Sequence, residues 1–388
     1  MKKFFYGFKT FFKETDKLLF CLCSATSIFG ILMVMSATRC KLEEGQIITR
    51  TALVMIAAVA FGIVLSLFIS FFDYRIFTKL WPIIGVVCVG LMVALFFFGK
   101  APILRPDSKI WLSFGPVDFQ PSELLKIGFI ITFGVHLEKL GHKINNPLNI
   151  LGLAVHAIVP TALVVKTGDM GSALVFLVIT AIMLFIAGIH WGYFVGGIAL
   201  IGAASPLIWT YVLQPLQRDR FLALINPDLY PAVIYQQKLG LNAIGAGGFN
   251  GQGLFKGAYT QGGVVPESQN DMIFSVIGEE LGFIGCTIAL LLLTLIVLRM
   301  IYVGKKSSEQ STNFICCGMA AMIAGQVIIN IGMCLMLLPV VGITLPFFSS
   351  GGSSNLCIYI GIGLVLSIYR HNCEQKAINL KVYDSLKK

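Results

Sequence analysis

Long apolar runs recur along this chain, and mostly short polar links separate them. Each run has about 17 to 24 residues, which is long enough for a helix to cross a hydrocarbon core of about 30 Å. About ten such runs are present, near residues 18–37, 48–71, 81–98, 122–137, 148–165, 171–187, 191–211, 272–298, 314–338 and 353–369. The pattern predicts an all-α polytopic membrane protein with about ten transmembrane helices.

Two of the links differ from the rest. The longest, at about 212–271, lies between the seventh and eighth runs and predicts a long loop outside the bilayer. The link from Leu338 to Ser354 is uncharged and rich in Pro, Gly and Ser. Irregular backbone is tolerated at membrane depth only against protein, so we expect this second link to dip into the membrane.

Composition and charge agree with a membrane protein. The chain has 388 residues, of which 56% are hydrophobic and 12% charged, whereas soluble domains carry about a quarter charged residues. A net charge of +10 can indicate nucleic-acid binding. The basic residues lie in links and tails beside apolar runs, so no nucleic-acid partner is expected. The ten cysteines show neither metal-ligand nor disulfide spacing.

Basic residues also predict the orientation. Three alternate links and both tails are basic, and the links carry Arg75, Lys79, Lys139, Lys143, Lys305 and Lys306. Cytoplasmic links carry an excess of Lys and Arg, so these links and both termini are predicted to be cytoplasmic and the long loop extracytoplasmic. Residues 1–17 predict a cytoplasmic amphipathic segment lying on membrane lipid, residues 18–369 the transmembrane domain and residues 370–388 a cytoplasmic tail.

Carboxylates gather where the eighth run begins. The sequence PESQNDMIFSVIGEELGFIG, from Pro266 to Gly285, contains Glu267, Asp271, Glu279 and Glu280. A charge near hydrocarbon is costly, so such residues indicate a functional site. Ser268 and Asp271 also match the capping-box pattern S-x-x-D, which leaves a structural alternative for Asp271.

Further polar residues fall on the same predicted side of the membrane. Glu123 and Lys126 are three apart on a predicted helix and can pair, and Gln326 and Asn330 suit hydrogen bonds between helices. The candidate substrate-binding residues are Lys109, Glu123, Lys126, Lys166, Asp169, Arg218, Arg220 and Lys238. Cations can hold a lipid-linked diphosphate while a carboxylate acts as a base. The same inventory suits ion-coupled transport, and the residues alone do not choose between the two.

Four ordered blocks resemble the SEDS family (shape, elongation, division and sporulation), which includes RodA, FtsW and SpoVE. They are WLSFGPVDFQPSELLK at Trp111–Lys126, KTGDMGSAL at Lys166–Leu174, the Pro266–Gly285 block, and NIGMCLMLLPVVGITLPFFSSGGSS at Asn330–Ser354. Within the family, KGAYTQGG at 256–263 and LLPVVGI at 337–343 are most similar to RodA.

The resemblance implies a peptidoglycan glycosyltransferase of the cytoplasmic (inner) membrane, acting in cell shape or division. Such a protein polymerises lipid II on the outer face, with lipid-linked glycan as donor and a class B penicillin-binding protein as partner. Asp271 matches the essential aspartate of the family, and Glu123, Lys126 and Asp169 match its other polar residues. Divalent-cation dependence is also implied, although nothing in the sequence has metal-ligand spacing. A lipid II flippase is the alternative.

The chain departs from the family pattern at three positions. Ile110 stands where the family usually has Arg, with Lys109 one place earlier, and Lys lacks the planar bidentate fork of Arg. Ser350 replaces the Tyr of S-Y-G-G, and Met272 replaces a Phe. We expect an inverting transfer in which Asp271 accepts the proton of the sugar hydroxyl, while Lys109, Lys126, Arg218 or Arg220 neutralises the departing diphosphate.

Overall fold

A computed structural model describes residues 15–42, 45–101, 108–115 and 117–386, the last stretch as backbone only from residue 374. The predicted amphipathic segment at the N-terminus lies almost entirely outside the described residues. The helices before the hairpin are α2 (Lys17–Thr38), η1 (Arg39–Lys41), α3 (Arg50–Phe71), α4 (Tyr74–Lys79) and α5 (Trp81–Phe98). The antiparallel hairpin pairs β1 (Leu112–Phe114) with β2 (Val117–Phe119), Ser113 opposite Asp118.

The remaining elements are helical. They are α6 (Pro121–Leu140), η2 (Gly141–Lys143), α7 (Pro147–Lys166), α8 (Met170–Ile186), α9 (Trp191–Leu207), the π-helical turn η3 (Ile208–Val212), α10 (Pro215–Ile225), α11 (Pro231–Gly247), α12 (Ala258–Gln261), α13 (Ile273–Lys305), α14 (Gln310–Cys334) and α15 (Gly352–Leu386). Within the described residues, helices occupy all ten predicted spans, and eight are long and apolar enough to cross a membrane. The predicted polytopic all-α fold is confirmed.

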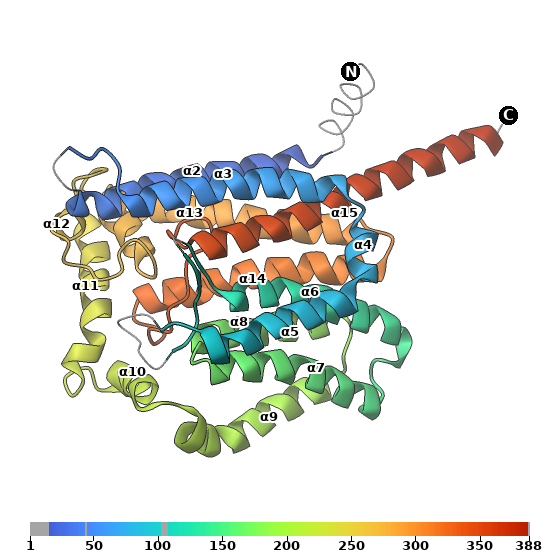
Figure 1. Cartoon of the computed structure of the whole chain (residues 1–388), viewed down its shortest axis with the longest axis horizontal. Helices are drawn as coiled ribbons and strands as arrows, with labels where there is room; N and C mark the ends of the chain where they lie inside the picture. Colours follow the sequence, from blue (N-terminus) through green and yellow to red (C-terminus); the bar gives the residue numbers. More distant parts are fainter. Residues whose placement is uncertain (1–14, 43–44, 102–107, 116, 387–388) are drawn as a thin grey trace.

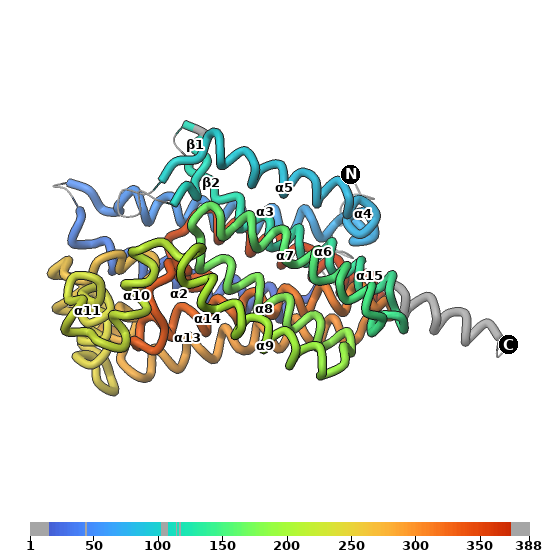
Figure 2. Tube along the Cα trace, turned by 90° about the horizontal axis from the view of Figure 1, so that it is seen from below, coloured from blue at the N-terminus to red at the C-terminus, as the bar shows by residue number. Residues whose placement is uncertain are grey.

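The spanning helices form an elongated bundle with two different ends (Figure 1). Helices α10, α11 and α12 gather at one end, and the hairpin lies at that same end (Figure 2). We call this the loop end. The start of α2 and the extension of α15 lie at the other, which we call the tail end. Helix α15 continues without a break past the predicted boundary at residue 369, so the tail begins as part of the last spanning helix.

Helices α14 and α15 form the centre of the bundle, whereas α9 lies on its surface (Figure 1). In the apolar stretches of α14 and α15, 78% of the residues are buried, whereas none are buried in the apolar stretch of the span from Trp191 to Val212. A helix that is apolar on all sides suits either a protein core or lipid. The central helices α14 and α15 are of the first kind, and the exposed apolar surface of α9 suits contact with lipid.

The long loop is largely helical. Helix α11 packs on α13 so closely that a Cβ on Gly247 would lie 1.9 Å from the Gly278 carbonyl oxygen. The Gln237 amide of α11 donates to the carbonyls of Met333 and Leu338, each at 2.8 Å. These contacts hold α11 against α13 and the end of α14.

The ninth span ends earlier than predicted. Helix α14 stops at Cys334 rather than near 338, and Met336 has a left-handed φ of 57°. The Leu337 amide closes the turn by donating to the Gly332 carbonyl at 2.8 Å. Pro339 follows, and proline cannot continue a helix because it lacks the N–H. The predicted end of this span was wrong because the residues after Cys334 form a C-terminal cap of α14. These capping residues are apolar, so hydrophobicity alone does not distinguish them from the helix.

Residues 335–351 then form an irregular segment, which begins and ends three residues before the predicted link at 338–354. We call it the re-entrant segment. Its Phe347 and Phe348 are fully buried. A Cβ on Gly30, in the middle of α2, would lie 2.1 Å from the Phe347 carbonyl oxygen. Gly30 is eight residues from the end of α2, so the segment descends about 12 Å along that helix.

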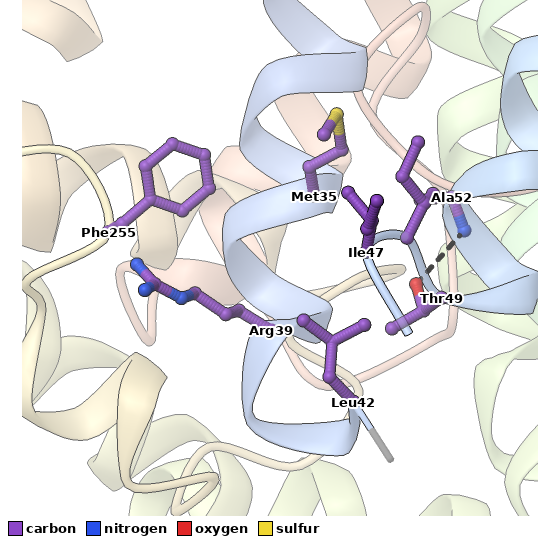
Figure 3. Close-up of a pocket in the computed structure, with 8 residues that line it drawn as sticks. Met35, Arg39, Leu42, Ile47, Thr49, Ala52 and Phe255 are labelled. Atoms are coloured by element: carbon purple, nitrogen blue, oxygen red, sulfur yellow. Dashed lines mark hydrogen bonds between the residues drawn. The ribbon is translucent and has the colours of Figure 1, made fainter. Parts of the chain in front are cut away.

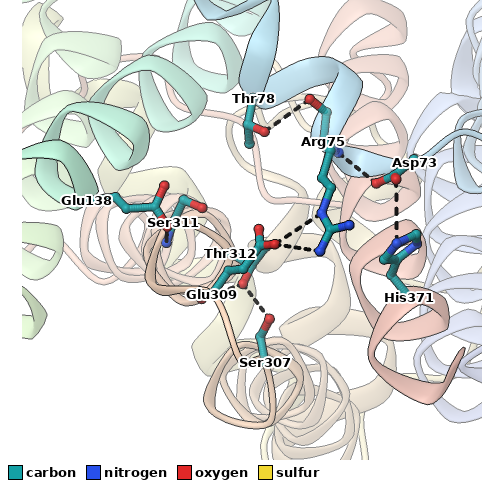
Figure 4. A network of polar contacts seen from close by, with 9 residues as sticks. All are labelled: Asp73, Arg75, Thr78, Glu138, Ser307, Glu309, Ser311, Thr312 and His371. Atoms are coloured by element: carbon teal, nitrogen blue, oxygen red, sulfur yellow. Dashed lines mark hydrogen bonds and ion pairs between the residues drawn. The ribbon is translucent and has the colours of Figure 1, made fainter. Parts of the chain in front are cut away.

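Polar contacts fasten α4, α14 and α15 at the tail end (Figure 4). The Arg75 guanidinium pairs with Glu309 at 2.7 Å, and His371 lies 3.4 Å from Asp73. Glu138 of α6 accepts from the Ser311 amide at 3.0 Å, as suits a carboxylate at a helix N-terminus. Burial, and then the neighbouring Glu309, raise the pKa of the Tyr74 phenol above its usual range. Tyr74 therefore stays neutral beside this network.

The contact at Gly30 generates a stability prediction. Gly30→Ala forces backbone of the re-entrant segment to move, so we expect a loss of about 1–3 kcal/mol, as for other overpacked cores. Gly90→Ala is the control, since a Cβ at this α5 position meets nothing within 4 Å, and we expect no loss. Thermal unfolding of both purified variants in detergent measures the difference. Equal melting temperatures would contradict the described packing.

Candidate functional site

Asp271 lies in a tight turn just before α13. The Glu267 carbonyl accepts from the amides of Asn270 at 2.9 Å and Met272 at 3.2 Å. Glu267 itself has a left-handed φ of 51°, and its carboxylate accepts from the Asn270 side chain at 2.7 Å. These bonds fix the direction in which the backbone presents Asp271, which is 9% exposed.

The turn does not form the capping box that S-x-x-D suggested. Helix α13 begins at Ile273, and Met272, which occupies the N-cap position, provides no side-chain cap. The Ser268 hydroxyl instead donates to the Ala37 carbonyl of α2 at 3.5 Å. The capping alternative is wrong because the chain makes one more turn between Ser268 and the helix.

Side chains of α14 and the re-entrant segment hold this turn. The buried Asn330 amide donates to the carbonyls of Asp271 at 2.8 Å and Ile343 at 2.7 Å. The Ser349 hydroxyl donates to the Asn270 carbonyl at 2.8 Å. Ser350, one of the departures from the family pattern, donates to the Asn270 side chain. Asn330 thus joins separate segments, as the sequence predicted, whereas the buried Gln326 side chain makes no hydrogen bond with the described residues, so the prediction is wrong for Gln326. Ser350 has a partner of its own.

Glu123 and Lys126 form a buried ion pair on the first turns of α6. The Lys126 Nζ to Glu123 Oε1 distance is 2.7 Å, and the Lys126 side chain is fully buried. The other Glu123 oxygen lies 3.5 Å from the Ser354 hydroxyl, which contacts Thr344 at 3.1 Å. The predicted pairing is confirmed, and it connects α6 to the segment that also supports Asp271.

Asp169 is buried at the N-terminus of α8. One carboxylate oxygen accepts from the Ser172 amide at 3.0 Å and caps the helix. The other accepts from the Gln120 side chain at 2.9 Å and the Ser122 hydroxyl at 3.0 Å. Asp169 therefore ties α8 to the start of α6, next to Glu123.

The basic candidates divide into two groups. Arg220 donates to the Val340 carbonyl at 2.8 Å and so joins α10 to the re-entrant segment. Arg218 donates to backbone carbonyls beside η3, at Leu213 and Thr210. Lys109, Lys166 and Lys238 are exposed at the loop end. Within the described residues, Arg220 contacts the re-entrant segment directly, and Asp271 and Glu123 connect to it through Asn330 and Ser354. Lys126 and Asp169 join this group through α6, whereas the contacts of Arg218 lie elsewhere.

Two fully buried glutamates anchor the long loop. Glu279 accepts from the amides of Tyr259 at 2.6 Å and Thr260 at 2.9 Å, and from the Thr260 hydroxyl. Glu280 accepts from the Ser36 hydroxyl at 2.6 Å, the Gln261 side chain and the Phe255 amide. The sequence marked both carboxylates but did not assign them a role. The sequence signal for this role was the pair of adjacent charges inside an apolar run, because buried carboxylates require hydrogen-bond donors nearby.

Helix α13 changes direction just after these glutamates. Gly282 has a φ of 63°, and the Phe283 amide donates to the Gly248 carbonyl instead of continuing the helix. Only glycine adopts this conformation without strain. The kink opens backbone groups that pair with the loop between α11 and α12.

The described residues do not fit a resident divalent cation. They contain no group of three or more His, Cys, Asp and Glu side chains arranged to hold one. Glu123 is neutralised by Lys126, and both oxygens of Asp169 accept hydrogen bonds from protein groups. Divalent cations require several free oxygen ligands.

Comparison with known proteins identifies the family. The family model for the cell cycle proteins FtsW, RodA and SpoVE matches residues 16–374. The chain belongs to the SEDS family. The resemblance of the four sequence blocks to this family is thereby confirmed. The prediction of a multi-pass membrane protein is confirmed with it.

Individual relatives cover nearly the whole chain. It is 29% identical to the peptidoglycan glycosyltransferase MrdB of Escherichia coli K12, over 94% of this chain and 96% of that protein. It is 30% identical to the stage V sporulation protein E of Bacillus subtilis 168, over 92% and 97%.

Solved structures agree with the fold. One, described as a peptidoglycan synthase complex that coordinates polymerization and crosslinking, has a TM-score of 0.79 at 26% identity, covering 92% of this chain and 98% of that one. The rod shape determining protein RodA of Thermus thermophilus has a TM-score of 0.68 at 24% identity, covering 92% and 97%.

The buried ion pair generates the second prediction. Lys126→Met leaves Glu123 buried without its cation, which should cost about 3–5 kcal/mol of stability. The double variant Glu123→Gln, Lys126→Met removes both charges, and we expect most of the loss to be recovered. Thermal unfolding of the three proteins in detergent provides the comparison. A double variant no more stable than the single one would mean that the pair does not act as a unit.

Proposed function

We propose that this chain is a peptidoglycan glycosyltransferase that polymerises lipid II into glycan strands at its loop end. Membership of the SEDS family and similarity to a named peptidoglycan glycosyltransferase support the activity. The observation that carries the proposal is the position of Asp271, in a turn held by α14 and the re-entrant segment at the loop end of the bundle. A carboxylate fixed at a membrane surface suits proton transfer from a sugar hydroxyl.

The loop end faces the outside of the cytoplasmic membrane. Arg75, Lys79, Lys139, Lys143, Lys305 and Lys306 all lie at the tail end, where an excess of basic residues favours the cytoplasm. The C-terminal extension of α15 then projects into the cytoplasm. Lipid II presented on the outer leaflet would reach Asp271 from the same side.

In the proposed reaction Asp271 is the general base. The sugar hydroxyl of lipid II attacks the anomeric carbon of the lipid-linked glycan, and its proton moves to an Asp271 oxygen. The new C–O bond forms as the bond to the diphosphate oxygen breaks, and the electron pair leaves with the diphosphate. Attack from the face opposite the leaving group inverts the anomeric configuration. A stable anionic leaving group needs no second carboxylic acid, unlike the paired carboxyls of glycoside hydrolases.

Basic residues around the turn neutralise the departing diphosphate. Arg220, Arg218, Lys109, Lys166 and Lys238 all lie at the loop end. Lys126 contributes less net charge than the sequence suggested, because Glu123 balances it at 2.7 Å. The described carboxylates do not fit a metal ion, and any divalent cation would bind together with the diphosphate of the substrate.

A transpeptidase partner follows from the same proposal. The solved complex similar to this chain couples polymerization to crosslinking. We infer that a class B penicillin-binding protein joins this chain in the membrane and crosslinks the strands that it makes, for cell shape or division.

Asp271→Asn tests the role of this carboxylate. The amide keeps the shape of the side chain and the backbone contacts of the turn but cannot take up the proton. Polymer formation from purified lipid II should fall by about 10²–10⁴-fold, the usual contribution of a general base. Gel analysis of the glycan products measures the rate, and unchanged melting temperature confirms folding.

Asp228→Asn is the matched control, because it makes the same chemical change at an exposed position of the same loop. We expect it to polymerise normally. Normal polymerisation by the Asp271 variant would refute the base assignment. A wild-type protein that makes no polymer from lipid II already on the outer face would instead favour the flippase.

Native cysteines test the orientation. Cys40 is exposed at the loop end and Cys373 is partly exposed at the tail end. A membrane-impermeant maleimide should label wild-type protein in intact spheroplasts. The labelling should persist in Cys373→Ser and disappear in Cys40→Ser, as measured by a gel shift. The reverse pattern would place the loop end in the cytoplasm.

A further inference from the structure

A pocket lies at the loop end, between the end of α2 and the start of α3. Its volume is about 260 Å³, and its apolar wall consists of Met35, Leu42, Ile47, Ile48 and Ala52. Figure 3 shows Arg39 extending from the end of α2 toward Phe255, which comes from the loop between α11 and α12. The hydroxyl of Thr49 also borders the pocket, but it caps α3 through the Ala52 amide at 3.3 Å.

Arg39 is the cation of this pocket. Its guanidinium carbon lies 5.5 Å from the centroid of the Phe255 ring, within cation–π range. The side chain is exposed, and it makes no hydrogen bond or ion pair with any residue that the structure describes. A guanidinium has five N–H donors in a planar fork. Among the described residues, the donors of Arg39 are therefore available beside an apolar wall.

Phe255 is held in place by the buried Glu280. Its backbone has a left-handed φ of 63°, which is unfavourable for an aromatic residue. The Phe255 amide donates to Glu280 Oε2 at 3.1 Å, and the Gly253 amide donates to the Glu280 carbonyl at 2.9 Å. Strained residues that persist in this way occur at ligand clamps.

We propose that this pocket binds an anionic phospholipid of the leaflet at the loop end. The phosphodiester contacts the Arg39 guanidinium through paired N–H···O bonds, as is common for Arg with phosphate. The glycerol and first chain carbons lie against Met35, Leu42 and Ile47. Asp271 does not line this pocket, so lipid binding here is separate from the proposed glycosyl transfer.

The position of the pocket favours a lipid. It lies where two spanning helices reach the membrane surface, which is the depth of phospholipid headgroups. Ile47 is 88% exposed and Ile48 37% exposed. Apolar side chains that are exposed at this depth are covered when a lipid chain lies against them.

Charge and size favour a phospholipid over a polyprenyl diphosphate. One guanidinium matches the single negative charge of a phosphodiester, whereas a diphosphate needs more cations. The neighbouring Lys41 is directed to Gln269 Oε1, 3.0 Å away, and does not line the pocket. The volume holds roughly nine groups the size of water, at about 30 Å³ each. That space suits the headgroup-proximal part of one chain.

Native mass spectrometry of the full-length protein tests the proposal. Delipidated protein is titrated with phosphatidylglycerol, or with phosphatidylcholine as the zwitterionic comparison. We expect one phosphatidylglycerol to be retained in preference to phosphatidylcholine. Arg39→Gln should weaken that retention by about tenfold, as expected for a lost charged hydrogen bond. Arg39→Lys, which keeps the charge without the fork, should lie between them.

Lys256→Gln is the matched control, since it removes an exposed cation next to Phe255 but outside the pocket. It should retain phosphatidylglycerol as the wild type does. Neutralising Glu43 and Glu44, which follow Leu42 and lie outside the described residues, should not weaken retention. Phe255→Leu, which removes the ring beside Arg39, provides a second test if Arg39→Gln does not fold, and it should also weaken retention.

Three results would overturn the assignment. Wild-type retention by both Arg39→Gln and Phe255→Leu would show that the pocket is not the site. Equal retention of phosphatidylcholine would show that charge is not recognised. Displacement of phosphatidylglycerol by equimolar undecaprenyl diphosphate, or by inorganic phosphate alone, would assign the pocket to a lipid carrier or to a free anion.

Discussion

The structure depends on one constraint, which is that backbone polar groups inside a bilayer have no water to bind. The re-entrant segment is irregular and descends beside the middle of α2, so its carbonyls need donors from protein. Polar side chains from three helices provide them. Arg220 bonds Val340, Asn330 bonds Ile343, and Asn355 bonds the carbonyls of Ser349 and Gly351. Asn330 and Asn355 lie within the central helices α14 and α15, and the Asn330 amide also donates to the Asp271 carbonyl, which connects this support to the turn that carries Asp271.

Buried carboxylates follow the same rule in two ways. Glu123 is balanced by a cation, while Glu279 and Glu280 accept hydrogen bonds from hydroxyl, amide and backbone donors. In the first solution the charge pair stays within α6, and the second Glu123 oxygen contacts Ser354 of α15 at 3.5 Å. In the second solution, several loop segments donate hydrogen bonds to one carboxylate, because each carboxylate accepts up to four. In both solutions a buried carboxylate, which costs free energy to bury, joins segments that apolar packing alone would not hold in one position.

The sequence was sufficient for features that depend on local pattern and insufficient for those that depend on contact. Apolar length located the spans, and three-residue spacing paired Glu123 with Lys126. Pattern failed at Ser268 and Asp271, where an extra turn precedes α13. It failed again at 335–338, where a cap replaces apolar helix. It also had no means to bring His136 and His156, on different helices, to a ring nitrogen distance of 3.0 Å.

Left-handed backbone at non-glycine residues is concentrated at the loop end. In the part of the chain that the structure describes, the non-glycine residues with left-handed φ are Phe255, Glu267, Met336 and Phe347. All of them lie in the long loop or the re-entrant segment, the two segments that surround Asp271. Each conformation costs about 1–3 kcal/mol and persists only where other contacts determine it. At Phe255 and Glu267 those contacts are carboxylate hydrogen bonds. A surface that keeps such strain holds its groups in place before any substrate arrives, which is what an electrostatically organised active site requires.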